Sequence, residues 1–174
     1  MDVRQLFLNH VGQTSQEPLC LHVVKAEGSK LWDVEGKEYI DLIAGISVCN
    51  IGHRHTAVLE AIKAQLDKYL HVMVYGEFME SPQIEYAALL SAHLPSNLNS
   101  IFYTASGSEA TEGAMKLAKR YTGRTEFISC FNAYHGASQG ALSIAGDENF
   151  KNAFRPLLPD IQHIHHGCIG NLKK

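Results

Sequence analysis

The segment from Phe102 to Lys119 constrains this chain most, because an apolar stretch turns through a loop of small residues into a helical pattern. Ser106, Gly107 and Ser108 form that loop, and their side chains are small enough to let a ligand approach the backbone. The first turn of a helix offers N–H groups that have no partner within the helix. The segment therefore predicts a phosphate-binding loop at a strand-to-helix junction.

The same residues have a second interpretation, which does not involve a ligand. Ser106 and Glu109 fit the S-x-x-E pattern of a capping box, and such boxes commonly begin helices. From this segment alone, both interpretations stay open.

The next segment extends the pattern to a strand-helix-strand unit. We expect a strand ending at Tyr103, a helix over about 107–121 and a second strand over 126–131. Such units leave their strands parallel, so the loops after both strands lie at one edge of the sheet, where open α/β sheets bind ligands. The second loop, 132–136, would bring Tyr134 and His135 beside the phosphate-binding loop. Tyr134 could then stack on a flat ligand, although a tyrosine in a loop often serves packing alone.

The remaining pattern predicts short elements. Val3, Leu6, Phe7 and His10 share one face of an N-terminal amphipathic helix. Strands are expected over 21–26, 30–33 and 38–41, with a turn at 35–36, and helices over 56–69 and 81–94, the second beginning at Ser81 and Pro82.

Composition excludes several classes of protein. The 174 residues carry a net charge of only -3, so nothing favours a nucleic-acid partner. No apolar run approaches the ~20 residues of a membrane helix, and four scattered cysteines indicate a reduced, cytoplasmic protein.

The histidines from His163 to His166 read as an edge strand and its end rather than a zinc site, and we expect no metal. Gly45, Ile46 and Ser47 read as a glycine-permitted turn.

These motifs together resemble the class III pyridoxal-phosphate aminotransferases. The resemblance rests on 102–119, on Tyr134-His135-Gly136, and on the upstream stretches 28–41, 45–46 and 52–55. It implies an α/β chain of the fold-type I class of pyridoxal-phosphate transferases with a mainly parallel sheet. Residues 1–55 would be an N-terminal segment belonging to the small domain, and residues 56–174 the first part of the cofactor-binding large domain.

The resemblance also implies the site. Ser106, Gly107 and Ser108 would bind the phosphate of pyridoxal 5'-phosphate, Tyr134 would stack on its ring, and His135 would hydrogen-bond within the cofactor loop. Gly45, Ile46 and Ser47 would lie on the substrate side. The implied substrates are an amino donor and a keto-acid or aldehyde acceptor, bound by a cytoplasmic homodimer.

Two departures from the family pattern limit what can be expected. Ala137 stands where many members have an arginine, which weakens the case for acetylornithine or ornithine as substrate. No counterpart is found for the Schiff-base lysine or for the acidic residue that faces the pyridine nitrogen. We therefore expect a truncated chain with no catalytic residue of its own, inactive alone. A mutase or racemase of the same fold, and a non-catalytic module that binds a phosphorylated ligand, remain the alternatives.

Overall fold

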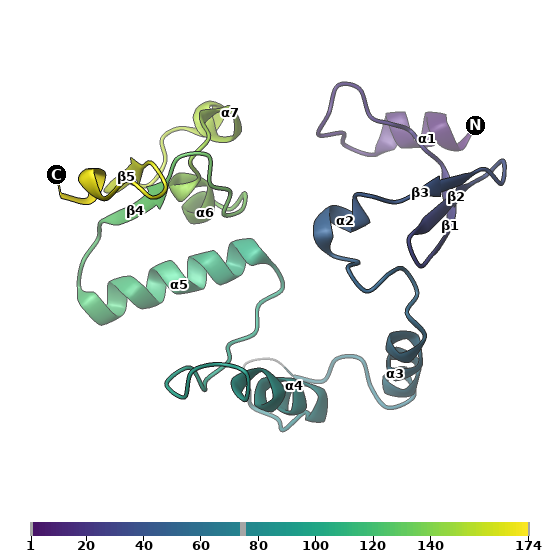
Figure 1. Ribbon diagram of the computed structural model, residues 1–174, viewed down its shortest axis with the longest axis horizontal. Coiled ribbons are helices and arrows are strands. Elements are labelled where there is room, and N and C mark those ends of the chain that lie inside the picture. Colours follow the sequence, from purple (N-terminus) through teal and green to yellow (C-terminus); the bar gives the residue numbers. More distant parts are fainter. Residues whose placement is uncertain (1, 74–75, 174) are drawn as a thin grey trace. The chain divides into compact units, whose positions relative to one another are not determined.

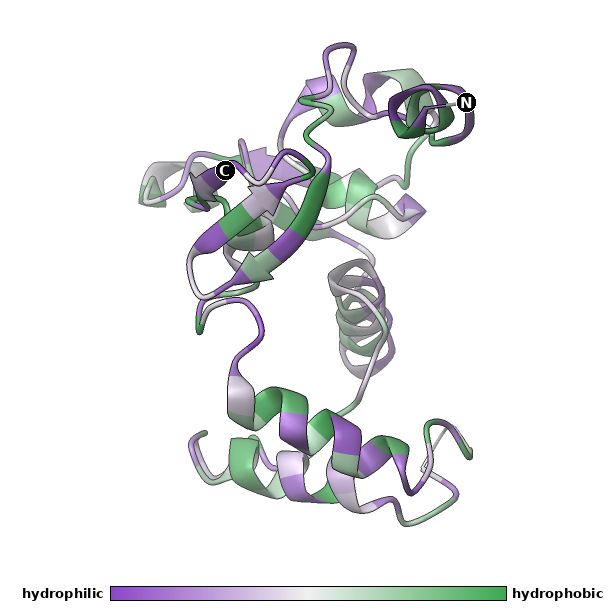
Figure 2. Cartoon of the chain, turned by 90° about the vertical axis from the view of Figure 1, so that its right-hand side faces the viewer, coloured by the Kyte–Doolittle hydropathy of each residue, from purple (hydrophilic) through white to green (hydrophobic). Residues whose placement is uncertain are grey.

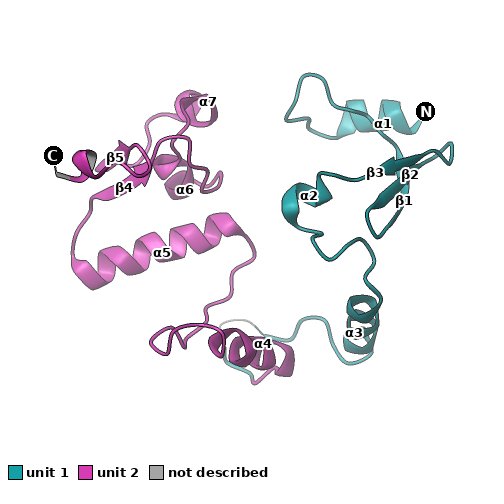
Figure 3. Ribbon diagram, viewed as in Figure 1, with its two compact units in different colours: residues 1–78 teal, residues 79–174 magenta. Residues whose placement is uncertain are grey.

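A computed structural model describes residues 2–73 and 76–173, which form two compact units, residues 1–78 and 79–174 (Figure 1, Figure 3). In the first unit the elements are α1 (Val3–His10), β1 (Val23–Glu27), β2 (Lys30–Asp33), β3 (Glu38–Ile40), α2 (Ala44–Ser47) and α3 (Thr56–Leu66). In the second they are α4 (Ser81–Ser91), α5 (Gly107–Thr122), β4 (Phe127–Cys130), α6 (Gln139–Ile144), α7 (Glu148–Lys151), η1 (Asn152–Phe154), β5 (Ile161–Ile164) and η2 (Ile169–Lys173). The domain boundary expected between residues 55 and 56 stays a prediction. The two units are groups of residues in mutual contact, which is not the same as a division into domains.

The first unit contains an antiparallel sheet in the order β1-β2-β3. Asp33 ends β2 and shapes the turn that follows, because its Oδ1 accepts hydrogen bonds from the N–H groups of Glu35, 3.0 Å, and Lys37, 2.9 Å. The hydroxyl of Tyr39 donates to the other oxygen of Asp33 at 2.7 Å, which links β3 to the turn. The three predicted strands and the turn at 35–36 are confirmed.

The second unit is organised around α5, a helix of 16 residues. Ser106 caps its start in an extended conformation, and Gly123 ends it with a left-handed φ of 70°, donating its N–H to the carbonyl of Lys119. The helix predicted over 107–121 is thereby confirmed. The predicted helix over 81–94 is shorter in the structure. Its N-cap is Glu80 rather than Ser81, and beyond Ser91 the chain continues in turns.

A parallel pair of strands, β4 and β5, follows α5, with Phe127 opposite Ile161 and Cys130 opposite Ile164. The prediction of a strand ending at Tyr103 is wrong. An extended segment forms a strand only where a neighbour completes its ladder, and within the described residues β4 pairs with β5 alone. Phe102 is 82% exposed, and the hydroxyl of Tyr103 donates instead to the carbonyl of Gln83 at 2.6 Å.

The buried core of the second unit is small and lies where α5 meets α6. Met115, Ala141, Leu142 and Ala145 are the buried apolar residues among those described. Large apolar side chains remain exposed on helices, strands and loops of both units. Figure 2, coloured by hydropathy, shows hydrophobic residues spread along the elements of the chain. The α5–α6 contact therefore fixes the region that holds the candidate site.

Candidate cofactor site

The start of α5 forms a capping box, and two backbone N–H groups there have no partner among the described residues. The Oγ of Ser106 accepts the N–H of Glu109 at 3.2 Å, and the Glu109 carboxylate accepts the N–H of Ala105 at 2.7 Å. Within the described part of the chain, the N–H groups of Gly107 and Ser108 donate no hydrogen bond. The two interpretations of this motif are thus compatible, because the cap fixes the helix start while two amides stay available to an anion.

The loop after β4 lies directly on this first turn of α5. The backbone N–H of Ala137 donates to the Oγ of Ser108 at 3.1 Å, and the Thr111 hydroxyl lies 3.1 Å from the carbonyl of His135. Gly136 makes this approach possible, because a Cβ at that position would lie 2.9 Å from the Cα of Ser108. The sequence expectation that this loop and the helix start lie together is confirmed.

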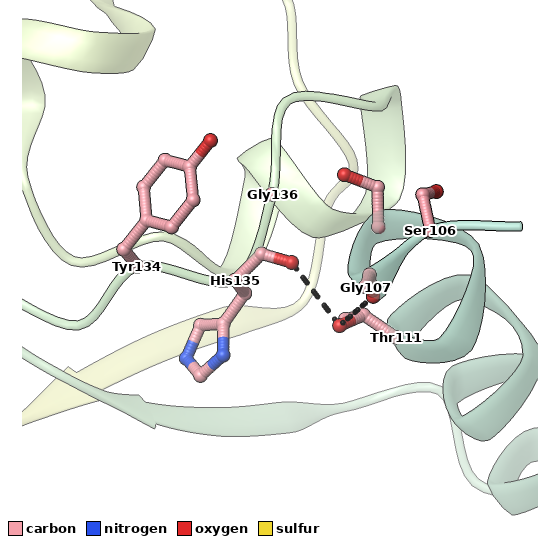
Figure 4. A pocket seen from close by; sticks show the side chains of 7 residues that line it. Ser106, Gly107, Thr111, Tyr134, His135 and Gly136 are labelled. Carbon is pink, nitrogen blue, oxygen red and sulfur yellow. Dashed lines mark hydrogen bonds between the residues drawn. The ribbon is translucent and has the colours of Figure 1, made fainter. Parts of the chain in front are cut away.

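A pocket of about 490 Å³ lies between the loop and the helix start. It is lined by Ser106, Gly107, Ser108, Thr111, Tyr134, His135 and Gly136. Figure 4 shows Tyr134 and Ser106 on opposite sides of this pocket. The Tyr134 side chain is 65% exposed, and its ring contacts Phe150 edge-on at a centroid distance of 5.8 Å.

His135 contributes to the pocket through its backbone more than through its ring. Figure 4 shows its carbonyl facing Thr111 while the imidazole points away from Ser106 and Gly107. The Nε2 of His135 lies 3.1 Å from the Oγ of Ser129 on β4. This contact holds the loop against the strand.

Thr111 is a pocket residue that sequence reasoning missed. Its hydroxyl lies 3.0 Å from the carbonyl of Gly107 as well as 3.1 Å from that of His135. Helical spacing could have found it, because residues three and four apart share one face of a helix, and Thr111 follows Ser108 by three.

Gly45, Ile46 and Ser47 belong to the other unit, where they form a left-handed turn with Ala44. All four residues have positive φ, between 49° and 63°. Asp41 holds the start of this turn, because its Oδ1 accepts the N–H groups of Ile43, 3.0 Å, and Ala44, 2.9 Å. The substrate-side role of the turn stays a prediction.

His53 contacts Asp41, the residue at the start of this turn. Its Nε2 lies 2.6 Å from the Oδ2 of Asp41, and this hydrogen bond, with those from Ala44 and Ile43, lowers the pKa of the Asp41 carboxyl. The backbone of His53 also pairs with that of Gly28 in both directions, at 3.0 and 2.8 Å. His53 thereby links Asp41, at the start of the turn, to Gly28.

Neither a metal cluster nor a membrane helix is found among the described residues. No group of three or more His, Cys, Asp or Glu side chains is placed to hold a metal ion there. The rings of His163 and His165 both contact the ring of Phe131, at centroid distances of 5.7 and 4.8 Å. Over the same residues, every helix is too short or too polar to cross a bilayer.

The mixed α/β fold, with its parallel pair of strands, is that of the fold-type I class of pyridoxal-phosphate transferases. The chain belongs to the class-III aminotransferase family, whose sequence profile matches residues 11–173. Pyridoxal phosphate is accordingly the cofactor of this class.

Individual relatives agree with this assignment. An acetylornithine aminotransferase of Methanopyrus kandleri is 41% identical over all of this chain and 44% of its own length, and one of Bacillus cereus is 40% identical over 88% of this chain and 39% of its own. The chain thus spans about two fifths of the length of these two relatives.

Among solved structures, the adenosylmethionine-8-amino-7-oxononanoate aminotransferase of Methanocaldococcus jannaschii superposes with a TM-score of 0.86 at 32% identity, covering 94% of this chain and 40% of that one. An (S)-enantioselective omega-transaminase of Thermomicrobium roseum gives 0.84 at 31% identity, with 94% and 39% covered.

Proposed function

We propose that this chain provides the phosphate and ring contacts for pyridoxal 5'-phosphate in an enzyme that transfers an amino group from an amine or amino acid to a keto acid or aldehyde. The observation that carries the proposal is the pairing of two unpartnered amides, those of Gly107 and Ser108, with the Tyr134 ring across one pocket. Pyridoxal 5'-phosphate has a phosphate at one end and a flat ring at the other. The phosphate fits the helix start, and the ring fits the aromatic side chain beside it.

The residues of the pocket would each make a different contact with the cofactor. The amides of Gly107 and Ser108, with the positive end of the α5 dipole, would hold the phosphate. Tyr134 would cover one face of the ring, and Thr111 would keep the loop and the helix together through the carbonyl of His135. Pyridoxal phosphate, when bound, supplies the aldehyde that takes up the amino group and the ring that withdraws charge.

The 174-residue chain by itself is proposed to bind the cofactor without catalysing transfer. Among the described residues, those that line the pocket include no lysine. Lys116 is exposed on α5, and the Nζ of Lys151 donates to the carbonyl of Ala145 at 2.6 Å. A proton on substrate carbon would therefore have no amine nearby to move it.

The reaction class is supported by the relatives. Those named above are aminotransferases or transaminases, which favours amino-group transfer over the mutase and racemase alternatives. Two of them act on acetylornithine by name. Here Ala137 offers only its backbone N–H, which Ser108 accepts, so a donor's α-carboxylate would need a cation from elsewhere.

The oligomeric state and the cellular location of the protein are also proposed. We propose a two-fold homodimer in the cytoplasm, with the cofactor near the subunit interface. Exposed apolar residues such as Leu42 and Ile46, 91% and 86% exposed, are the kind that folded proteins usually cover.

The test of the binding role compares Tyr134→Ala with Tyr134→Phe. Loss of the ring should weaken binding of pyridoxamine 5'-phosphate about 2- to 12-fold, which corresponds to the roughly 0.5–1.5 kcal/mol of an aromatic stacking contact. The phenylalanine variant should bind as the wild type does. Calorimetric titration measures this, and the amine form of the ligand avoids covalent attachment to exposed lysines.

Tyr121→Ala is the matched control, because Tyr121 lies on α5 with 89% of its side chain exposed and lines no part of the pocket. It should leave the affinity unchanged. Equal affinities for Tyr134→Ala and the wild type would show that the ring does not stack on the ligand.

A further inference from the structure

One face of α5 carries side chains that bind the segment after β4. Ser108, Thr111 and Glu112 are spaced as residues i, i+3 and i+4, so they point to the same side of the helix. Each one hydrogen-bonds to that segment, Ser108 and Thr111 through single contacts to the loop backbone. Glu112 makes the largest number of these contacts, and the proposed function gives it no role.

The Glu112 carboxylate lies at the start of α6. Its Oε1 accepts hydrogen bonds from the Oγ of Ser138 at 2.7 Å, the N–H of Gly140 at 2.6 Å and the N–H of Ala141 at 3.2 Å. Short bonds from several donors to one oxygen are typical of a charged acceptor. Gly140 leaves the space for this, because a Cβ there would lie 2.8 Å from the Cδ of Glu112.

The environment favours the ionised form of Glu112. The Ser138 hydroxyl lowers the pKa of this carboxyl most, burial opposes that effect, and the N–H groups of Ala141 and Gly140 and the charge of Lys116 lower it further. The carboxylate is therefore present as an anion at neutral pH, where it matches the positive end of the helix that it contacts.

We propose that Glu112 is a positioning residue that sets the distance between the Tyr134 ring and the phosphate-binding amides of Gly107 and Ser108. The inference rests on the proposed function of this pocket. The loop that carries Tyr134 runs from β4 to α6. Its first end is held by the pairing of β4 with β5, and its second end by Glu112, which belongs to the same helix as the two amides.

Removing the charge of Glu112 should affect the two ends of the pocket differently, which a general loss of stability would not do. With Glu112 neutral, the start of α6 loses its anionic acceptor. The Tyr134 loop is then held to α5 by the single contacts of Ser108 and Thr111, so it can move further from the helix. The amides of Gly107 and Ser108 stay where Ser106 caps the helix. Binding of the ring should weaken while binding of a phosphate ion alone should not.

The experiment measures the dissociation constants of inorganic phosphate and of pyridoxamine 5'-phosphate for the wild-type chain and for Glu112→Gln. We expect the pyridoxamine phosphate affinity to fall about 2- to 12-fold, the range set by stacking, with the phosphate affinity unchanged. Glu60→Gln removes an equal charge from an exposed position in the other unit and should change neither constant. Equal weakening of both ligands in Glu112→Gln, or no change in either, would overturn the inference.

Two further results keep the test decisive. If Glu112→Gln does not fold, Ser138→Ala is measured instead, because it removes one hydrogen-bond donor to Glu112 without changing the charge. The ratio of the pyridoxamine phosphate affinity to the phosphate affinity should then fall, as expected for Glu112→Gln, but by a smaller factor. An unchanged ratio in Ser138→Ala would then overturn the inference. If the wild type binds pyridoxamine phosphate no better than phosphate, the proposed function fails first and the role of Glu112 fails with it.

Discussion

Replacing Gly136 with alanine is expected to abolish the pocket. A Cβ at this position would lie 2.8 Å from the Cβ of Ser108, 2.9 Å from its Cα and closer still to its Oγ, and the φ of +125° is one that L-residues rarely adopt. The close approach to the backbone of Ser108 cannot be relieved by a change of rotamer. Strain and overpacking together should destabilise the second unit by about 2–4 kcal/mol, and binding of pyridoxamine phosphate should become undetectable.

Denaturant unfolding and calorimetric titration measure the two effects of Gly136→Ala. Gly123→Ala is the matched control, because Gly123 also has a positive φ, 70°, but nothing lies within 4 Å of its added Cβ. The control should lose about 1 kcal/mol of stability, the cost of an L-residue in the left-handed region, and keep its affinity. If Gly136→Ala bound the ligand as the wild type does, the loop would not lie on α5 as described.

The second large effect concerns catalysis. The 174-residue chain, mixed with pyridoxal phosphate, an amine donor and a keto-acid acceptor, should form product no faster than pyridoxal phosphate alone. The pocket lining among the described residues offers hydroxyls, backbone amides, a tyrosine and a histidine backbone, but no amine that could shuttle a proton. Product formation followed by chromatography over hours provides the measurement.

Turnover above the background of free cofactor would contradict this prediction. Gly136→Ala then serves as the control that locates the activity. Turnover lost in that variant would assign the chemistry to this pocket, and turnover retained would assign it to exposed lysines elsewhere on the chain.

Local signals were sufficient to predict α5 and its surroundings. The small residues at 106–108, the capping pattern with Glu109 and the glycine at 123 each act within one turn of the helix, so the sequence itself contains their effect. The loop at Tyr134 lies beside the start of α5 as predicted, although the strand ending at Tyr103, on which that prediction rested, is absent from the described residues.

Other features depend on partners that no local pattern reveals. The stretch ending at Tyr103 has the apolar character of a strand, but it lacks a neighbouring ladder in the described residues. The carboxylate of Glu112 contacts Ser138 and Gly140, 26 and 28 residues later in the chain, and nothing in the helical pattern of α5 indicates these partners. The turn that contains Ile46 likewise begins at Asp41, which His53 contacts from 12 residues later in the chain.

The central claim is that the start of α5 binds the phosphate of the cofactor, and amide chemical shifts test it most directly. A ¹⁵N-labelled chain is titrated with pyridoxamine 5'-phosphate, and in parallel with pyridoxamine, which has the same ring without the phosphate. We predict that the Gly107 and Ser108 resonances move with the first ligand and not with the second. Shifts confined to residues outside the pocket, or equal shifts with both ligands, would contradict the claim.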